Sequence, residues 1–239
     1  MTKKEFHLEL AAIEGNIAKI EKALNKSLFF KAADINTSFK DGTTALIVAT
    51  QNHRTEAINY LLAKGADKNM VDSKGFTAFA YSLKGKDEEI SIKLIPDNKE
   101  LIEAKTLPFP LSLAFKNKFY KLAQILLEKG VNPNCTFPKS SISVLVHCIQ
   151  DNLPNFAELL IKNGADVNNQ AVNGLNPLYC AVQKDSYQMV NLLLSNGAKL
   201  YKPEEISNTA QSKQTKNKKN ENNANNIYEP VLCIAIKNK

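Results

Sequence analysis

A pattern of apolar and polar positions recurs along the chain with a period of about 33 residues. In each copy two adjacent aliphatic residues are followed, three residues later, by a glycine and a short polar stretch. The copies are Leu61-Leu62 with Gly65-Ala66-Asp67-Lys68-Asn69, Leu126-Leu127 with Gly130-Val131-Asn132-Pro133-Asn134, Leu160-Ile161 with Gly164-Ala165-Asp166-Val167-Asn168, and Leu193-Leu194 with Gly197-Ala198. The glycines are 65, 34 and 33 residues apart, which corresponds to two repeats, one and one. A further copy is therefore expected near residue 98, where Leu94-Ile95 supplies the aliphatic pair.

A second landmark precedes each glycine. It is a triplet similar to Thr-Pro-Leu, and a small residue follows three positions after its last member. The triplets are Thr44-Ala45-Leu46, Thr77-Ala78-Phe79, Phe109-Pro110-Leu111, Ser143-Val144-Leu145 and Asn176-Pro177-Leu178. The small residues are Ala49, Ser82, Ala114, Cys148 and Ala181. The same columns continue through Leu8, Ala11 and Ala23 near the N-terminus and through Leu232 and Ala235 near the C-terminus.

These columns predict two helices in each repeat. Thr, Ser or Asn at the start of the triplet can cap a helix, which is worth about 1 kcal/mol, and proline is tolerated at the next position. The small residue lets two helices approach closely, and the aliphatic pair provides the apolar stripe of a second helix. The glycine suits the left-handed position that ends a helix. Asn163-Gly164 and Asn196-Gly197 could instead form hairpin turns, but the aliphatic pair just upstream favours helix termination.

With these columns in place, the sequence resembles the ankyrin-repeat family over residues 5 to 200 and again over 228 to 239. The resemblance implies an all-α repeat solenoid, a stack of units that each contain two antiparallel helices and a projecting β-hairpin, with each repeat contacting only its neighbours. We expect a capping repeat at residues 1–40, five repeats at 41–202, an insertion at 203–227 and a partial repeat helix at 228–239.

Three segments depart from the pattern. In the second full repeat, Pro96-Asp97-Asn98 occupies the place of the helix end and the glycine, and proline there shortens the helix. The following segment, 99–104, is typical of a helical turn instead of a hairpin, so this repeat is expected to be the least stable. An insertion around Ser27-Leu28-Phe29-Phe30 is expected to fold back on the first helix pair. The third segment, the Asn- and Lys-rich stretch 211–226, has too few apolar residues to offset the entropy of ordering and is predicted to be disordered.

The C-terminal half-repeat leaves two interpretations open. A solenoid needs a polar cap at its end, so either the apolar helix that contains Val231 and Ile236 closes the stack itself, or the chain is a fragment of a longer protein.

Composition restricts the functional classes. The chain has 239 residues, of which 44% are hydrophobic and 23% charged, with a net charge of +7. Its apolar runs are too short for a transmembrane helix, and its first twenty residues do not resemble a signal peptide. The four cysteines show no CxxC spacing, so neither a zinc site nor a disulfide framework is expected, and a reducing intracellular compartment is favoured.

Candidate chemistry is sparse. His147-Cys148 could suggest a cysteine nucleophile with a histidine base, but Cys148 belongs to the small, buried column, which favours a structural role. Asp67 and Asp166 occupy a turn position of the repeat rather than a paired-acid site. Lys84-Gly85-Lys86 lacks the context of a phosphate-binding loop. We therefore predict no catalytic residue, no metal site and no cofactor.

Binding to another protein is the leading hypothesis. By the family resemblance, partners contact the hairpins and the concave face of the first helices. The positions that correspond to this surface are Phe39, Val71, Phe76, Lys84, Lys116, Phe137, Ile142, Gln150, Leu175, Gln183 and Lys184. An apolar ridge beside a Gln/Lys strip suits a protein with apolar anchors and acidic groups. Two alternatives stay open: the apolar side chains could pack against adjacent hairpins, and the Gln/Lys strip could be a solvated face.

The sequence thus predicts a non-enzymatic, monomeric interaction module in the cytoplasm, with an unidentified protein as partner, no small-molecule substrate and no membrane insertion. One alternative is that the repeats recruit substrates for a longer enzyme. Another is weak nucleic-acid binding through Lys213 to Lys219, which is disfavoured because aromatic residues are missing there. The abundance of Lys, Asn and Ile, with Arg54 as the single arginine, suggests an AT-rich genome. This composition resembles that of ankyrin proteins from intracellular bacteria, which often act as effectors inside the host cell, or from protists.

Overall fold

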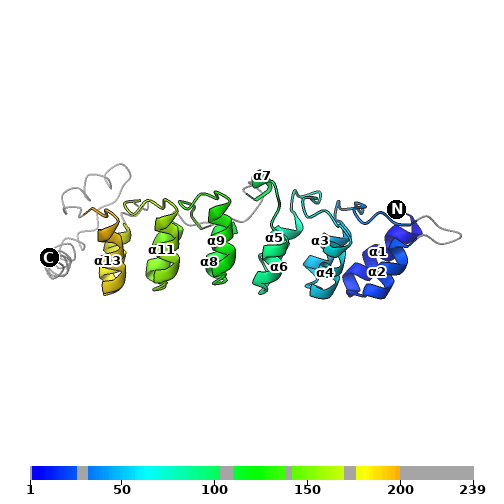
Figure 1. Ribbon diagram of the computed structural model, residues 1–239, viewed down its shortest axis with the longest axis horizontal. Coiled ribbons are helices and arrows are strands. Elements are labelled where there is room, and N and C mark those ends of the chain that lie inside the picture. The colour runs from blue at the N-terminus through cyan, green and yellow to red at the C-terminus, as the bar shows by residue number, and fades with distance from the viewer. Residues whose placement is uncertain (1, 26–31, 103–109, 138–141, 170–175, 200–239) are drawn as a thin grey trace, which may run out of the picture. The chain divides into compact units, whose positions relative to one another are not determined.

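The computed structural model describes residues 2–25, 32–102, 110–137, 142–169 and 176–199. The described residues form thirteen α-helices, and their extended pairing is limited to two isolated bridges, Val71 with Thr77 and Thr136 with Ser143 (Figure 1). The chain divides into two compact units, residues 1–131 and 132–239. The insertion at 27–30, the segment 203–227 and the half-repeat 228–239 lie outside the described residues.

The first unit consists of helix pairs that pack on one another in chain order. Its helices are α1 (Lys3–Glu14), α2 (Ile17–Leu24), α3 (Ala45–Gln51), α4 (Thr55–Ala63), α5 (Ala78–Ser82), α6 (Glu88–Lys93), α7 (Lys99–Ile102), α8 (Pro110–Lys116) and α9 (Tyr120–Glu128). Helix α1 packs against α2 and α3, and α3 packs against α4 and α5. Helix α6 packs against α5 and α9, and α8 packs against α9. Each pair therefore buries its apolar faces against its neighbours, as the repeat pattern predicts.

The second unit has the same plan. Its helices are α10 (Val144–Gln150), α11 (Pro154–Lys162), α12 (Pro177–Gln183) and α13 (Tyr187–Ser195). Helices α10 and α12 pack against each other and against their own partners α11 and α13, and α11 also packs against α13. The described residues of both units thus confirm an all-α repeat fold built of successive helix pairs.

The structure confirms the predicted helix ends. Thr44, Thr77, Ser143 and Asn176 each accept a hydrogen bond from the backbone N–H three residues on, at 3.3, 3.3, 3.4 and 2.7 Å. Such a bond satisfies one of the N–H groups that the first turn of a helix leaves unpaired. The predicted terminal glycines have left-handed backbones, with φ of 87°, 78°, 88° and 84° at Gly65, Gly130, Gly164 and Gly197.

The column of small residues lies in the core. Ala49, Ala114, Cys148 and Ala181 are fully buried, and Ser82 is 4% exposed. Their small volume permits close approach of neighbouring helices, and a larger side chain at such a close-packed position would force backbone shifts.

The turn between the two helices of a pair contains a non-glycine residue with a left-handed backbone, which the sequence pattern did not indicate. Two residues after a first helix, His53, Lys118, Asn152 and Asp185 have positive φ angles of 54°, 59°, 52° and 53°. A left-handed backbone costs a residue with a Cβ atom about 1–2 kcal/mol. The tight connection between the helices imposes this conformation, because the second helix begins within two residues of it.

The second full repeat is irregular, as the sequence predicts. Its helices α5 and α6 have only five and six residues. The short helix α7 follows in place of a hairpin and buries Ile102 completely. An ion pair of 2.8 Å between the half-buried Lys68 and the exposed Asp97 links this segment to the preceding repeat. The short helices leave this repeat with fewer intrahelical hydrogen bonds than its neighbours, which supports the expectation of low stability.

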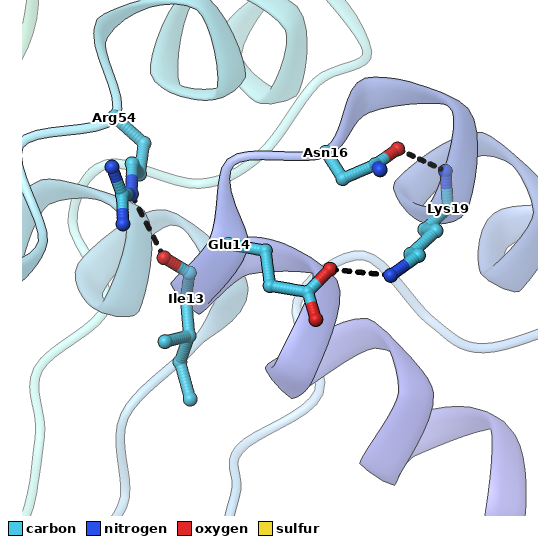
Figure 2. A network of polar contacts seen from close by, with 5 residues as sticks. All are labelled: Ile13, Glu14, Asn16, Lys19 and Arg54. Carbon is cyan, nitrogen blue, oxygen red and sulfur yellow. Dashed lines mark hydrogen bonds and ion pairs between the residues drawn. The ribbon is translucent and has the colours of Figure 1, made fainter.

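The first helix pair is attached to the next repeat through Arg54, the N-cap residue of α4 (Figure 2). Its Nε donates to the carbonyl oxygen of Ile13 at 2.9 Å, near the end of α1. In the same turn Asn16 caps α2 by accepting from the N–H of Lys19 at 3.0 Å, and Glu14 forms a 2.6 Å ion pair with Lys19. Gly15, with φ of 73°, is required between them because a Cβ there would lie 2.9 Å from the Arg54 side chain.

Asparagine side chains connect successive repeats. In the first unit, Asn36 Oδ1 accepts from the N–H of Asp67 at 2.8 Å, and Asn69 Oδ1 accepts from the N–H of Asp97 at 3.0 Å. In the second unit, Asn134 and Asn168 accept from Asp166 and Lys199 N–H groups, each at 2.8 Å. The asparagine that ends the polar stretch in the sequence pattern is therefore a link between neighbouring repeats.

We expect Asn134→Ala to lower the free energy of unfolding by about 1–2 kcal/mol, since the side chain makes two bonds across the repeat boundary and each such bond contributes about 1 kcal/mol. Besides accepting from Asp166, its Nδ2 donates to the carbonyl oxygen of Gly164 at 3.3 Å. Asn163→Ala is the matched control, because its Nδ2 bonds only the Leu159 carbonyl within its own helix, at 2.8 Å. Urea unfolding measures both variants, and equal losses would contradict the role of the asparagine link.

Candidate partner-binding surface

The first helix of each repeat presents one line of accessible side chains, four and seven residues after the N-cap position. A spacing of three residues places two side chains on the same face of a helix. In each unit we call these positions the first-helix face. Its exposed or half-buried members are Gln51, Tyr81, Lys84, Leu113 and Lys116 in the first unit, and His147, Gln150 and Gln183 in the second. Lys84, Lys116 and Gln183 are exposed and Gln150 is half-buried, so these predicted residues are accessible to a partner.

Tyr81 is at the centre of the best-defined part of this face. The Phe76 ring meets the Tyr81 ring edge-on, with centroids 5.7 Å apart and planes at 76°. The Lys84 Nζ lies 5.3 Å from the centroid of the same ring, a cation–π contact. The sequence prediction named Phe76 and Lys84 but missed Tyr81, whose signal was its position three residues before Lys84 on the same helix face.

Asp72 holds the hairpin that carries Phe76. Its carboxylate accepts from the Tyr81 hydroxyl at 2.6 Å and from the N–H groups of Lys74 and Phe76, each at 2.9 Å. Asp72 itself is only 6% exposed. A buried carboxylate with three donors fixes the loop, so the side chain of Phe76 is positioned before any partner arrives.

The Tyr81 hydroxyl stays protonated. Burial first, and then the hydrogen bond to Asp72, raise the pKa of Tyr81 above 10.0, while a hydrogen bond with Gln51 opposes this shift. The hydroxyl therefore remains a donor to Asp72 throughout the physiological pH range. Gln51, Tyr81 and Asp72 thus connect two neighbouring first helices and one hairpin.

The second unit repeats this arrangement with a histidine. The ring centroids of Phe137 and His147 lie 4.3 Å apart with planes at 64°. Burial lowers the pKa of His147 below 6.5, although the nearby Asp151 carboxylate opposes the shift, so the ring is neutral at pH 7. The Nε2 of His147 is buried without a hydrogen-bond partner among the described residues. Phe137 is half-buried, as Phe76 is.

The other predicted residues fall into three groups. Val71 is 40% exposed at the start of its hairpin, Ile142 is half-buried, and Lys184 is exposed. Phe39 is only 5% exposed, because its loop folds it into the core, and it therefore offers almost no surface to a partner. Leu175 lies outside the described residues.

The described ring contacts of the hairpin side chains lie within their own repeats. Phe76 and Phe137 contact the first helix of their own repeat through Tyr81 and His147, and both retain partial exposure. These rings serve the fold and remain accessible to a partner.

The described cysteines lack the properties of a nucleophile. Burial raises the thiol pKa of Cys135 and of Cys180 to about 11, and raises that of the fully buried Cys148 well above 9.0. A thiol must ionise to attack. The structure therefore supports a packing role for Cys148, despite its neighbour His147. The described part of the chain also contains no group of three or more His, Cys, Asp or Glu side chains that could hold a metal ion.

No helix among the described residues has the length and apolar character that crossing a membrane requires.

Known proteins share this sequence pattern. The family model for ankyrin repeats (3 copies) matches residues 8–106 and 110–203. Mouse B-cell lymphoma 3 protein homolog is 25% identical over 203 residues, which cover 80% of this chain and 44% of the mouse protein. The phosphocholine transferase AnkX of Legionella pneumophila is 26% identical over 209 residues, which cover 73% of this chain and 21% of AnkX. The chain therefore spans less than half the length of these two curated relatives.

A solved structure agrees with the sequence comparisons. The crystal structure of an ankyrin repeat domain from Acinetobacter baumannii aligns with a TM-score of 0.60 and 25% identity, covering 82% of this chain and all of that domain. The family model covers most of the chain, and the described helix pairs, caps and terminal glycines match the repeat pattern. The chain belongs to the ankyrin-repeat family.

Proposed function

We propose that this protein is a non-catalytic protein–protein interaction module that binds a partner through the first-helix face and the adjoining hairpins. Ankyrin repeats bind protein partners. The observation that carries the proposal for this chain is the cluster of Phe76, Tyr81 and Lys84, held in place by the buried Asp72. Aromatic side chains on a preformed support bind with little loss of conformational entropy.

The side chains of this surface define the chemistry of the partner. Val71 and Phe76 offer apolar area, while Lys84 and Lys116 are exposed cations on the first-helix face. Gln51, on the preceding first helix of the same unit, can donate and accept hydrogen bonds. The partner we propose is therefore a protein with apolar anchors and acidic groups, bound by a monomer of this chain.

The chemistry of the described thiols and of the polar groups in the cluster supports the binding role. The thiols of Cys135, Cys148 and Cys180 stay protonated, and the polar groups of the cluster, Asp72 and Tyr81, are engaged with each other. We also propose, from composition alone, an intracellular location and an effector role in a host cytosol.

A second candidate is a substrate-recruiting region of a longer enzyme. The relative AnkX is a phosphocholine transferase in which the matched repeats form 21% of the protein. The mass of the native gene product, measured in the source cells, decides between the two, because a recruiting region requires additional chain for a catalytic domain. The third hypothesis, nucleic-acid binding through residues 211–226, concerns a segment outside the described residues.

Affinity capture followed by mass spectrometry tests the proposed function. We expect the double variant Lys84→Glu, Lys116→Glu to recover at least about tenfold less partner than the unaltered chain, since reversed charges on a binding face repel an acidic surface. The matched control is Lys93→Glu, Lys121→Glu, which changes the charge equally on the second helices α6 and α9, where both lysines are exposed. Circular dichroism must show that both variants fold. Equal recovery by all three proteins would refute the assigned surface.

A further inference from the structure

The first helix pair forms a groove that is separate from the first-helix face. Helices α1 and α2 enclose a hollow of about 440 Å³. Four lysines, Lys3, Lys4, Lys19 and Lys22, line it together with Leu10, and its described lining includes no carboxylate. The described lining therefore combines the apolar side chains of Leu10, Ala11 and Ala23 with four lysines and His7.

The helical spacing explains how the lysines converge. Lys3 and Lys4 lie in the first turn of α1, and Lys19 and Lys22 are one turn apart on α2. Lys19 forms the 2.6 Å ion pair with Glu14 (Figure 2). Lys4 donates to the carbonyl oxygen of Asn25. Lys3 and Lys22 are exposed to solvent. The groove thus retains at least two accessible cations in addition to the two that are engaged.

An apolar stripe adjoins the groove through Leu10. Phe6, Leu10 and Ile13 are spaced four and three residues apart on α1, and they are 51%, 41% and 39% exposed. Three of the six large apolar side chains that the described residues expose are therefore on this one helix. Leu8 and Ala12 form the buried face of α1 and make its packing contacts, so the exposed stripe is not needed for them. A concentration of exposed apolar area on one element is typical of an interaction site.

We propose that the groove between α1 and α2, with the stripe beside it, binds an acidic amphipathic helix of a partner protein. The apolar side of such a helix would cover Phe6, Leu10 and Ile13, and its carboxylates would pair with Lys3 and Lys22. Helix α1 has 12 residues and is about 18 Å long, which matches about three turns of a bound helix. A nucleic-acid backbone would use the lysines but leave the apolar stripe uncovered, so the protein helix is the better fit.

A synthetic peptide provides the test. The probe is a fluorescein-labelled peptide of about 14 residues, built of leucines at helical spacing on one face and glutamates elsewhere. We expect fluorescence anisotropy to show saturable binding that weakens with salt. The double variant Lys3→Glu, Lys22→Glu should weaken binding of the peptide at least about tenfold. The variant Leu10→Ser should also weaken binding of the peptide, but the dependence of that binding on salt should stay the same.

Matched controls separate this groove from general charge effects. Lys40→Glu, Lys121→Glu changes the net charge equally at exposed lysines outside the groove and should leave binding within about twofold. A peptide with lysine in place of every glutamate should not bind. Equal weakening by both double variants, or binding of the lysine peptide, would overturn the proposal.

Three other outcomes would also overturn it by assigning another occupant. A labelled duplex RNA that binds more tightly than the acidic peptide, and that loses affinity in the Lys3→Glu, Lys22→Glu variant, would indicate a nucleic-acid site. A dimer in sedimentation that Leu10→Ser converts to monomers, with no binding of the peptide, would indicate a second copy of this chain. Peptide binding that appears only after Leu28, Phe29 and Phe30 are replaced by serine would indicate that the chain's own segment covers the stripe. None of these measurements uses the first-helix face, so their failure leaves the proposed function untouched.

Discussion

Phe79→Ala is expected to reduce the free energy of unfolding by about 3–5 kcal/mol, the usual cost of deleting a fully buried aromatic ring. Phe79 has no exposed surface and lies in α5, which has only five residues. The repeat around it depends on such contacts, because α5 and α6 are too short to be stable by their own hydrogen bonds. The lost ring leaves a cavity that these short helices cannot refill without moving.

Urea unfolding and hydrogen exchange measure this effect. We expect the amides of α5, α6 and α7 to exchange faster than those of α3 and α4, since a repeat protein can open one repeat at a time. Phe6→Ala is the matched control: it deletes the same ring from a side chain that is 51% exposed, and it should cost less than about 1 kcal/mol. Similar losses in the two variants, or uniform exchange along the first unit, would contradict this account.

Phe76→Ala is expected to weaken binding of the captured partner about tenfold or more. The same substitution should lower the free energy of unfolding by only about 1 kcal/mol. Truncating a central aromatic of an interface commonly costs 2 kcal/mol or more, or about thirtyfold in Kd. Phe76 is half-buried against Tyr81, so the fold loses an edge-on ring contact but no core volume. Isothermal titration calorimetry with the purified partner measures the change.

Tyr81→Phe separates positioning from direct contact. It keeps the ring that contacts Phe76 and Lys84 but removes the hydroxyl that donates to Asp72 at 2.6 Å. We expect a smaller loss of affinity than for Phe76→Ala, since the hairpin loses one of the three donors to its buried carboxylate. Tyr120→Ala, at a 37% exposed tyrosine of α9, is the control on a second helix. A Phe76→Ala variant that binds as tightly as this control would refute the surface.

Much of the fold could be predicted from the sequence because each repeat encodes its own local structure. The capping residues Thr44, Thr77, Ser143 and Asn176 and the glycines at helix ends act within a few residues of chain. Local hydrogen bonds and the conformational preference of glycine do not depend on distant contacts. The helical turn at 99–102 was predictable for the same reason.

The candidate site was predictable only in part. The repeat register identified Lys84, Lys116 and Gln183 as accessible positions, but the same register also assigned Phe39 to the surface. A loop residue's exposure depends on how the loop closes over neighbouring repeats, and hydrophobic residues in loops turn inward where a neighbouring core is open to them. Asp72 lies five residues before the N-cap Thr77, as Phe39 lies five residues before Thr44, and both side chains are buried. For Asp72, three hydrogen bonds offset the cost of removing its carboxylate from water.

The sequence by itself thus determined the family, the repeat length, the helix ends and the irregular second repeat, because these follow from short-range periodicity. The tertiary structure decided which contacts individual residues make: the bond from Tyr81 to Asp72, the links from Asn134 and Asn168 to the next repeat, and the placement of the α1 stripe beside four lysines. These features join residues from different elements of the fold, so they exist only after packing has brought those elements together.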